Sequence, residues 1–201
     1  MTYKKSVNKL PDDNTTWREW HVPVSYTEFS LGEILSSAEH MAAEQNDIPL
    51  MVQLIENPKF DIPGITLFNG SVGIDAHDCI HAILGRGMLP KDEAFIIGFT
   101  MGSTNRVSST EEKLYTLAAK YLYPGPYKFK DDEIQVFKDA VRLGYISDCA
   151  SLDVVDYNGY LDMNIEDARQ ALGVETSLLK AYYEIEARRY PDDIASQRLL
   201  K

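Results

Sequence analysis

The segment IDAHDCIHAILGRGMLPKDEAF, residues 74–95, combines two histidines and two carboxylates at short spacing. His77 and His81 are four residues apart, so on a helix their imidazoles share one face. Asp78 stands three residues before His81, and Glu93 follows after a short break. Imidazole nitrogens and carboxylate oxygens bind divalent cations of borderline hardness. The pattern therefore predicts a metal site, with zinc favoured over Fe(II) or Mn(II), whose ligands are His77, Asp78, His81 and Glu93.

A simpler explanation is a hydrogen-bonded pair of histidines near the surface, with Glu93 only complementing a helix dipole. The chain has four histidines, and two of them fall within this one turn of helix, which random placement explains poorly. Cys79 lies two residues after His77 and so on a different helix face. We expect Cys79 to be a small buried side chain rather than a ligand.

Two helices must bring these ligands together. The first is expected over residues 75–84, because Gly85 and Gly87 provide a helix stop. The second is expected over residues 90–101, because Pro90 suits the first turn of a helix. Glu93 then belongs to the opening turn of the second helix and can face back across the loop.

Apolar residues recur with helical periodicity along most of the remaining chain. The expected fold is therefore an all-α, single-domain helical bundle of about seven to eight helices over residues 17–201, preceded by a loose polar segment over residues 1–16. The stretch 58–73, which contains several Pro, Gly and Asn residues, and the polar stretch 148–160 are expected to be loops. Further helices are expected over residues 31–46, 48–56, 109–123, 131–143, 165–172 and 176–190.

Composition limits the function classes. The formal net charge of -11 argues against nucleic acid as a partner, since nucleic acids are polyanions. The two cysteines form no disulfide framework, and the N-terminus lacks an apolar secretory segment, which together favour a cytoplasmic location. The helix-turn-helix appearance of residues 165–190 is expected to be two packed helices, because the would-be recognition helix carries several glutamates.

The spacing His77-Asp78-x-x-His81, then eleven residues and Glu93, resembles the signature of the family of Coq4, the coenzyme Q biosynthesis protein. That signature is HDxxH followed by a glutamate about a dozen residues later, and all four positions are present here. The apolar AFIIGF segment after Glu93 also resembles the family. The resemblance covers residues 70–145. The family often has glycine where this chain has Asp92, and an arginine-rich segment where this chain has GSVGIDA.

The resemblance implies an all-helical protein that holds zinc or another divalent ion on the four residues of the signature. It also implies a prenylated, quinone-type ligand, peripheral contact with a membrane and association with other biosynthetic enzymes. A homo-oligomer is an arrangement that the sequence leaves open. Family members are linked to oxidative decarboxylation of the prenylated ring, in which a metal acts as a Lewis acid. Five residues are candidates for lining an isoprenoid groove, although helix packing explains them equally well: Ile83, Leu84, Phe95, Ile96 and Phe99.

Two alternatives remain. In an HD-type phosphohydrolase, His40 would join the His77-Asp78 pair and a distant aspartate around a metal that activates water. The candidates for that aspartate are Asp131, Asp132, Asp139 and Asp148. This alternative gives His81 and Glu93 no role and ranks lower. The second alternative is a non-catalytic lipid-binding or scaffold protein with a structural metal.

Overall fold

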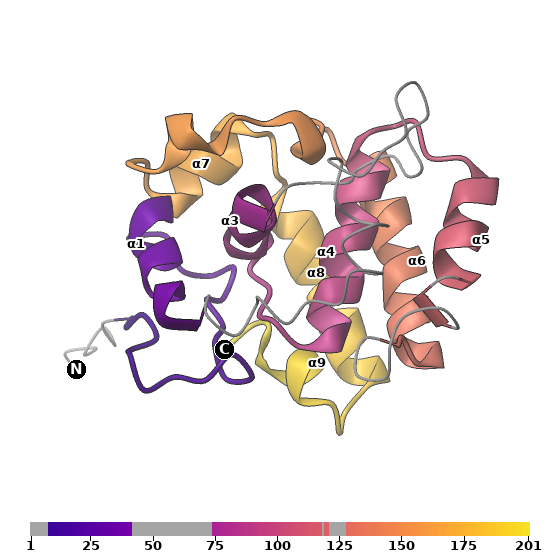
Figure 1. Cartoon of the computed structure of the whole chain (residues 1–201), viewed down its shortest axis with the longest axis horizontal. Coiled ribbons are helices and arrows are strands. Elements are labelled where there is room, and N and C mark those ends of the chain that lie inside the picture. The colour runs from indigo at the N-terminus through magenta and orange to yellow at the C-terminus, as the bar shows by residue number, and fades with distance from the viewer. Residues whose placement is uncertain (1–7, 42–73, 118, 121–127) are drawn as a thin grey trace, which may run out of the picture.

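The computed structural model describes residues 8–41, 74–117, 119–120 and 128–201. These residues form eight α-helices and short 3-10 helices that include η5 and η6, and their only β-type pairing is an isolated bridge between Ser30 and Asn164. The prediction of an all-α bundle is confirmed (Figure 1). The elements are α1 (Leu31–Ser36), α3 (Ile74–Leu84), α4 (Pro90–Ser103), α5 (Ser109–Leu117), α6 (Asp131–Ile146), η5 (Leu152–Val154), η6 (Tyr157–Tyr160), α7 (Ile165–Ala171), α8 (Thr176–Arg189) and α9 (Ile194–Arg198).

Helices α4 and α6 lie side by side and run in the same direction (Figure 1). Their backbones approach closely because glycines occupy the crossing. A Cβ atom at Gly102 would lie 2.2 Å from the Val141 carbonyl oxygen, and one at Gly144 would lie 2.2 Å from the Phe99 carbonyl oxygen. A side chain at either position would force the helices apart, so the small residues set this packing.

The buried hydrophobic side chains of the described residues form two clusters. A larger cluster joins α1, α3, α7 and α8 to one side of α4, and it includes Ile80, Ile83 and Tyr183. A smaller cluster lies among α4, α5 and α6, where the Tyr115 and Phe137 rings stack with centroids 4.8 Å apart. Helix α3 contacts α1, α4 and α7, so the two histidines are carried by a helix that is enclosed by its neighbours (Figure 1).

The residues considered for an isoprenoid groove lie in the core instead. Ile83, Leu84, Phe95, Ile96 and Phe99 are each at most 1% exposed. Phe95 stacks against Phe99 and Tyr182, with ring centroids 5.8 and 5.5 Å apart. Helix packing therefore accounts for these five side chains. Cys79 is 4% exposed and belongs to the same core, as expected.

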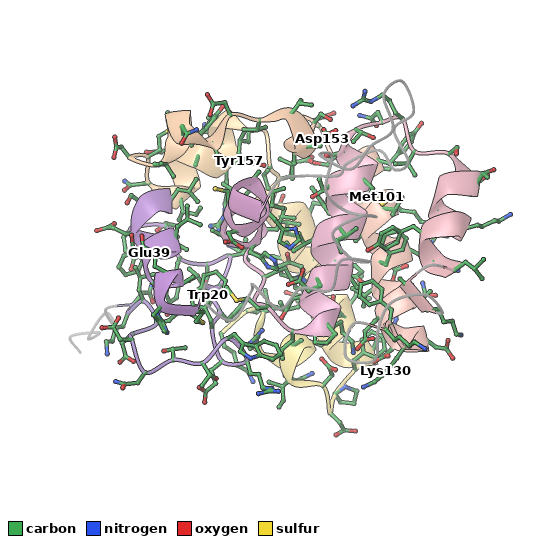
Figure 2. The ribbon with its side chains drawn as sticks, in the orientation of Figure 1. Trp20, Glu39, Met101, Lys130, Asp153 and Tyr157 are labelled. Carbon is green, nitrogen blue, oxygen red and sulfur yellow. The ribbon has the colours of Figure 1, made fainter. Side chains whose placement is uncertain are left out.

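Of the helix predicted over residues 31–46, the described part is α-helical over Leu31–Ser36 and forms a 3-10 turn over residues 39–41, and residues 42–46 fall outside the described residues. The Ser37 hydroxyl donates to the Ile34 carbonyl and accepts the Trp20 indole N–H, which offers the backbone an alternative to continued helix. Trp20 lies beside this end of α1 (Figure 2). The predictions for residues 48–56 and 58–73 fall outside the described residues.

Two other differences concern the second half of the chain. The stretch 148–160, predicted as loop, contains the short helices η5 and η6. Helix α9 was not predicted, because five residues are too few for a periodic signal. The helices predicted over residues 75–84, 90–101, 131–143, 165–172 and 176–190 are confirmed with small shifts of their ends. Among the described helices, none is long and apolar enough to cross a membrane.

Candidate metal centre

Helix α3 ends where the sequence indicates. Gly85 has a φ of 66°, a left-handed conformation that glycine adopts without strain. A Cβ there would also lie 2.6 Å from the Val24 backbone nitrogen. The Arg86 N–H donates to the His81 carbonyl and closes the last turn at 3.0 Å. The chain therefore leaves α3 directly after the turn that carries His81.

Side chains from α7 and α8 hold the end of α3. The Arg169 guanidinium donates to the Ala82 and Ile83 carbonyl oxygens at 3.0 and 2.8 Å. The Tyr183 hydroxyl donates to the Leu84 carbonyl oxygen at 2.5 Å. The Ala82 carbonyl also accepts the Gly85 N–H at 3.3 Å. Ile83 and Leu84 lie in the last turn of α3, where carbonyls lack partners within their own helix, so these bonds satisfy acceptors that would otherwise be buried unpaired. Neither Arg169 nor Tyr183 could be predicted from the sequence as a support of the site, because nothing in their spacing points to α3.

The first turn of α4 presents the carboxylate. Leu89 is the N-cap and Pro90 is the first helical residue, as the sequence indicates. Glu93 lies one turn into the helix, and its N–H donates to the Leu89 carbonyl at 3.0 Å. The partial positive charge at a helix N-terminus favours a carboxylate at this place.

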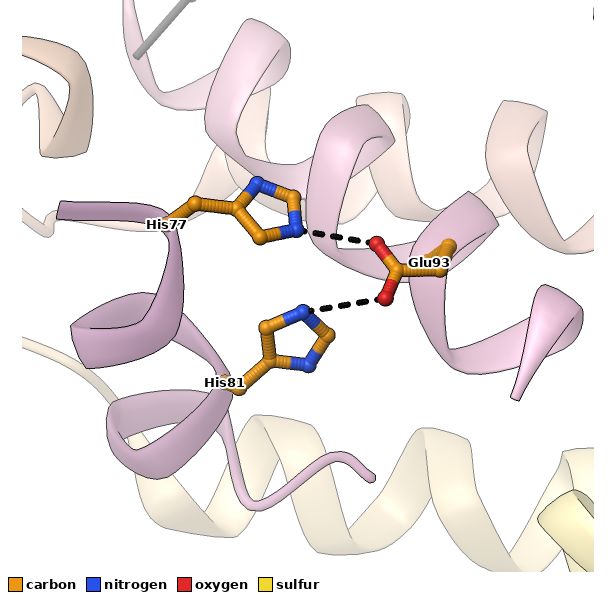
Figure 3. A group of neighbouring side chains, drawn as sticks. All are labelled: His77, His81 and Glu93. Atoms are coloured by element: carbon orange, nitrogen blue, oxygen red, sulfur yellow. Dashed lines mark hydrogen bonds and ion pairs between the residues drawn. The ribbon is translucent and has the colours of Figure 1, made fainter. Parts of the chain in front are cut away.

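His77, His81 and Glu93 converge across the loop between α3 and α4 (Figure 3). His77 Nε2 lies 2.9 Å from Glu93 Oε2, and His81 Nε2 lies 3.3 Å from Glu93 Oε1. The imidazole centroids are 4.7 Å apart. One ligand atom from each residue lies within 4.8 Å of the others, so the three side chains form a group that could hold a metal ion.

The group lies at the boundary between core and solvent. The His81 side chain is 2% exposed, whereas those of His77 and Glu93 are 23% and 31% exposed. Burial raises the pKa of Glu93, but the adjacent imidazoles of His81 and His77 outweigh that effect and hold this pKa well below its ordinary range. Glu93 is therefore an anion whenever the protein is near neutral pH, which is the form that binds a cation.

His81 Nδ1 is buried, and no described residue accepts or donates a hydrogen bond there. The Nε2 atom of the same ring faces Glu93, so Nε2 is the nitrogen available to a metal. In most protein metal sites the other ring nitrogen of a ligating histidine donates to a carboxylate, a carbonyl or water. A bound metal would therefore place an N–H at Nδ1, where no described residue supplies an acceptor.

The three converging residues were all predicted as ligands. Asp78, the fourth predicted ligand, is half-buried on α3, and its carboxylate is not among the ligand atoms that converge. Its role as a ligand stays a prediction. Cys79 is likewise not among the converging groups and points into the core.

An HD-type phosphohydrolase would also need His40 and a distant aspartate beside His77, and neither is brought to this group. His40 is exposed, and its Nε2 lies 2.8 Å from the Thr15 carbonyl oxygen. Asp132 pairs with Lys91, and Asp139 pairs with Arg189. The remaining two candidates, Asp131 and Asp148, are also not among the converging ligand atoms.

Comparison of the chain with protein-family models, with curated proteins and with solved structures gives no match. A functional assignment therefore depends on the residues of the site and on their geometry.

Proposed function

We propose that this chain is a metal-binding protein that holds one divalent cation, Zn²⁺ in the first place and Fe²⁺ or Mn²⁺ otherwise, on His77, His81 and Glu93. The observation that carries the proposal is the convergence of two Nε2 atoms on the two oxygens of one carboxylate. Zinc binds such atoms at about 2.0–2.1 Å, so ligands at the corners of a tetrahedron stand about 3.3 Å apart. The separations of 2.9 and 3.3 Å, each to a different oxygen of Glu93, are close to that value. With one ligand atom from each residue the spread is within 4.8 Å, so a cation would draw the three side chains closer together.

Three protein ligands leave a coordination position open. A set of two histidines and one glutamate with an open position is typical of catalytic zinc, and two histidines with one carboxylate also suit non-haem Fe(II). A metal bound there supplies Lewis acidity to an oxygen of a ligand that enters the open position. If Asp78 also binds, four ligands close a tetrahedron, which is typical of a structural site. The position of Asp78 therefore distinguishes a catalytic from a structural metal.

The ligand that we propose is a prenylated, quinone-type molecule, in a protein that resembles the Coq4 family. The residues that support this are His77, Asp78, His81 and Glu93 at the family spacing, followed by the apolar α4. The proposed activity is assistance in the decarboxylation of the ring, or organisation of the enzymes that act on it. The buried aromatic residues of α4 belong to the core and do not contribute evidence for a prenyl groove.

Elemental analysis of protein purified without a histidine tag tests the metal. We expect about one zinc, iron or manganese per chain in the wild type, and none in the His77→Ala/His81→Ala double variant. His40→Ala is the matched control, because it removes an exposed imidazole outside the group. Loss of metal in His40→Ala would favour the phosphohydrolase, and absence of metal from the wild type after incubation with each ion would refute the proposal.

The ligand needs separate experiments. Organic extraction of the purified protein followed by mass spectrometry should recover a prenylated ring compound from the wild type. Release of carbon dioxide from a prenylated hydroxybenzoate then tests catalysis. Recovered ligand without turnover would favour the scaffold, and flotation with liposomes would test contact with a membrane.

A further inference from the structure

Asp92, the residue before Glu93, is tied to the C-terminal helix. Its side chain is completely buried, and its Oδ2 accepts the Leu89 N–H at 3.1 Å. The same oxygen accepts a bond from Nη2 of Arg198 at 2.5 Å. Arg198 is the last residue of α9 and stands 106 positions further along the chain. The first turn of α4 is thus joined to α9.

A second buried charge holds the preceding loop. The Arg86 guanidinium donates to both carboxylate oxygens of Glu186 on α8, at 3.0 and 2.6 Å. It also lies 3.7 Å from Oδ1 of Asp92 and 3.9 Å above the Phe95 ring. Glu186 Oε1 in turn accepts a bond from the hydroxyl of Ser196 on α9. The loop between the two ligand-bearing helices is therefore fixed against α8 and α9.

Lys91 fixes the same turn from another side. Its side chain is 2% exposed, and its Nζ lies 2.9 Å from a carboxylate oxygen of Asp132 and 2.9 Å from one of Asp193. Asp193 is the N-cap of α9. Two of the three consecutive side chains at 91–93 are thus held by charged partners, and the third is the proposed metal ligand.

Consecutive side chains project about 100° apart around a helix axis. Holding Lys91 and Asp92 in defined directions therefore sets the rotation of the first turn of α4. That rotation decides whether the carboxylate of Glu93 meets the imidazoles of α3. A functional constellation must be held to within about 0.5 Å to work well, so a small rotation of this turn matters.

We propose that Arg198 is a positioning residue for the metal centre, acting through its ion pair with Asp92. Helix α9 then sets the geometry of a site to which it contributes no ligand. This inference rests on the proposed metal-binding function. Without the guanidinium, Asp92 would be a buried carboxylate without its closest cation, and the first turn of α4 would shift to hydrate or re-pair it.

The test compares Arg198→Met and Arg198→Lys with a control of similar destabilisation. Val141→Ala serves as the control, because it removes buried apolar volume in the cluster between α4 and α6 and touches no residue of the network. Zinc affinity is measured by competition with a chelator, and the Co²⁺-loaded proteins are compared by visible absorption. We expect Arg198→Met to bind about tenfold more weakly with an altered cobalt spectrum. Arg198→Lys should recover part of the loss, and Val141→Ala should match the wild type.

A second measurement does not depend on metal. The nitrogen-15 shifts of His77 and His81 in metal-free protein report whether Glu93 faces their rings. We expect them to change in Arg198→Met and to stay unchanged in Val141→Ala. Unchanged shifts and unchanged affinity in Arg198→Met would overturn the inference. If the wild type bound no metal, the proposed function would fail, and the nitrogen shifts alone would decide whether Arg198 positions Glu93.

Discussion

Arg169 Nε donates a hydrogen bond to the carbonyl oxygen of Ile83 at 2.8 Å, across 86 positions of sequence. The same buried guanidinium donates to the carbonyls of Val24, Tyr26 and Ala82. All four of these bonds go to backbone oxygens, so Arg169 acts as a cap for the end of α3 and as an anchor for the segment before α1. One side chain from α7 therefore joins the end of the helix that carries both histidines to the segment before α1.

We expect Arg169→Met to lower the free energy of unfolding by roughly 3 kcal/mol or more. The variant keeps apolar volume but leaves several buried carbonyls without donors, and each costs about 1–3 kcal/mol. Urea denaturation followed by circular dichroism measures the change. Arg188→Met on the exposed face of α8 is the control and should stay within about 0.5 kcal/mol of the wild type. Equal losses in the two variants would show that the carbonyl bonds do not stabilise the fold.

Stability should be sensitive to side-chain size at the glycines where α4 and α6 cross. Gly102→Ala should destabilise the protein by about 2 kcal/mol or more, because its Cβ would overlap the Val141 carbonyl oxygen. Gly159→Ala should be neutral or slightly stabilising, because nothing lies within 4 Å of a Cβ at that position. Thermal unfolding of the two variants beside the wild type checks the pair. A Gly102→Ala protein as stable as Gly159→Ala would mean that the helices can separate at little cost.

Local signals in the sequence were enough to predict most helices and the central part of the site. Pro90 and Gly85 mark helix ends through their own backbone preferences, so they predict the break between α3 and α4. The four-residue spacing of His77 and His81 places both imidazoles on one face whatever the rest of the chain does. Glu93 could be added because it falls in the first turn after a short loop.

Local sequence signals could not predict the direction of the Asp78 side chain. They also could not predict which residues support the site. Asp78 neighbours His81 on the helix, but its rotamer depends on what surrounds α3. Arg169 and Arg198 act through partners 86 and 106 positions away. Pairings over such separations are set by the packing of whole helices, and no spacing rule in one sequence reveals them.

Metal binding should be visible as added stability. A saturating excess of zinc, at about 100 times its dissociation constant, stabilises a folded protein by about 2.7 kcal/mol. For a chain of this size that corresponds to a rise in Tm of about 5–10 °C. We expect the rise in the wild type and not in Glu93→Gln, because the neutral amide is a poor ligand for zinc. Glu184→Gln, an exposed change on α8, should keep the full rise. A rise that survives Glu93→Gln would place the zinc elsewhere.

The stability of the fold should depend on pH through His21. Burial is the main cause that lowers its pKa from 6.5 to about 4, and the positive charge of Arg198 adds to it, while Asp92 opposes it. The unfolded chain therefore binds a proton on His21 between about pH 6.5 and 4 that the folded protein does not bind. Stability is full above about pH 6.5 and falls as the pH drops through this window, by roughly 3 kcal/mol at most.

The measurement is the urea midpoint of chelator-treated protein at several pH values between about 7 and 5, above the range in which most carboxylates titrate. In His21→Gln the side-chain amide nitrogen can take the place of His21 Nε2, which lies 3.1 Å from the Gly85 carbonyl oxygen, but it cannot bind the proton. The acid-induced loss should therefore be smaller in His21→Gln than in the wild type. His40→Gln removes an exposed histidine and should lose as much stability as the wild type. Equal losses in all three proteins would mean that His21 is protonated in the folded state, and that another group accounts for the pH dependence.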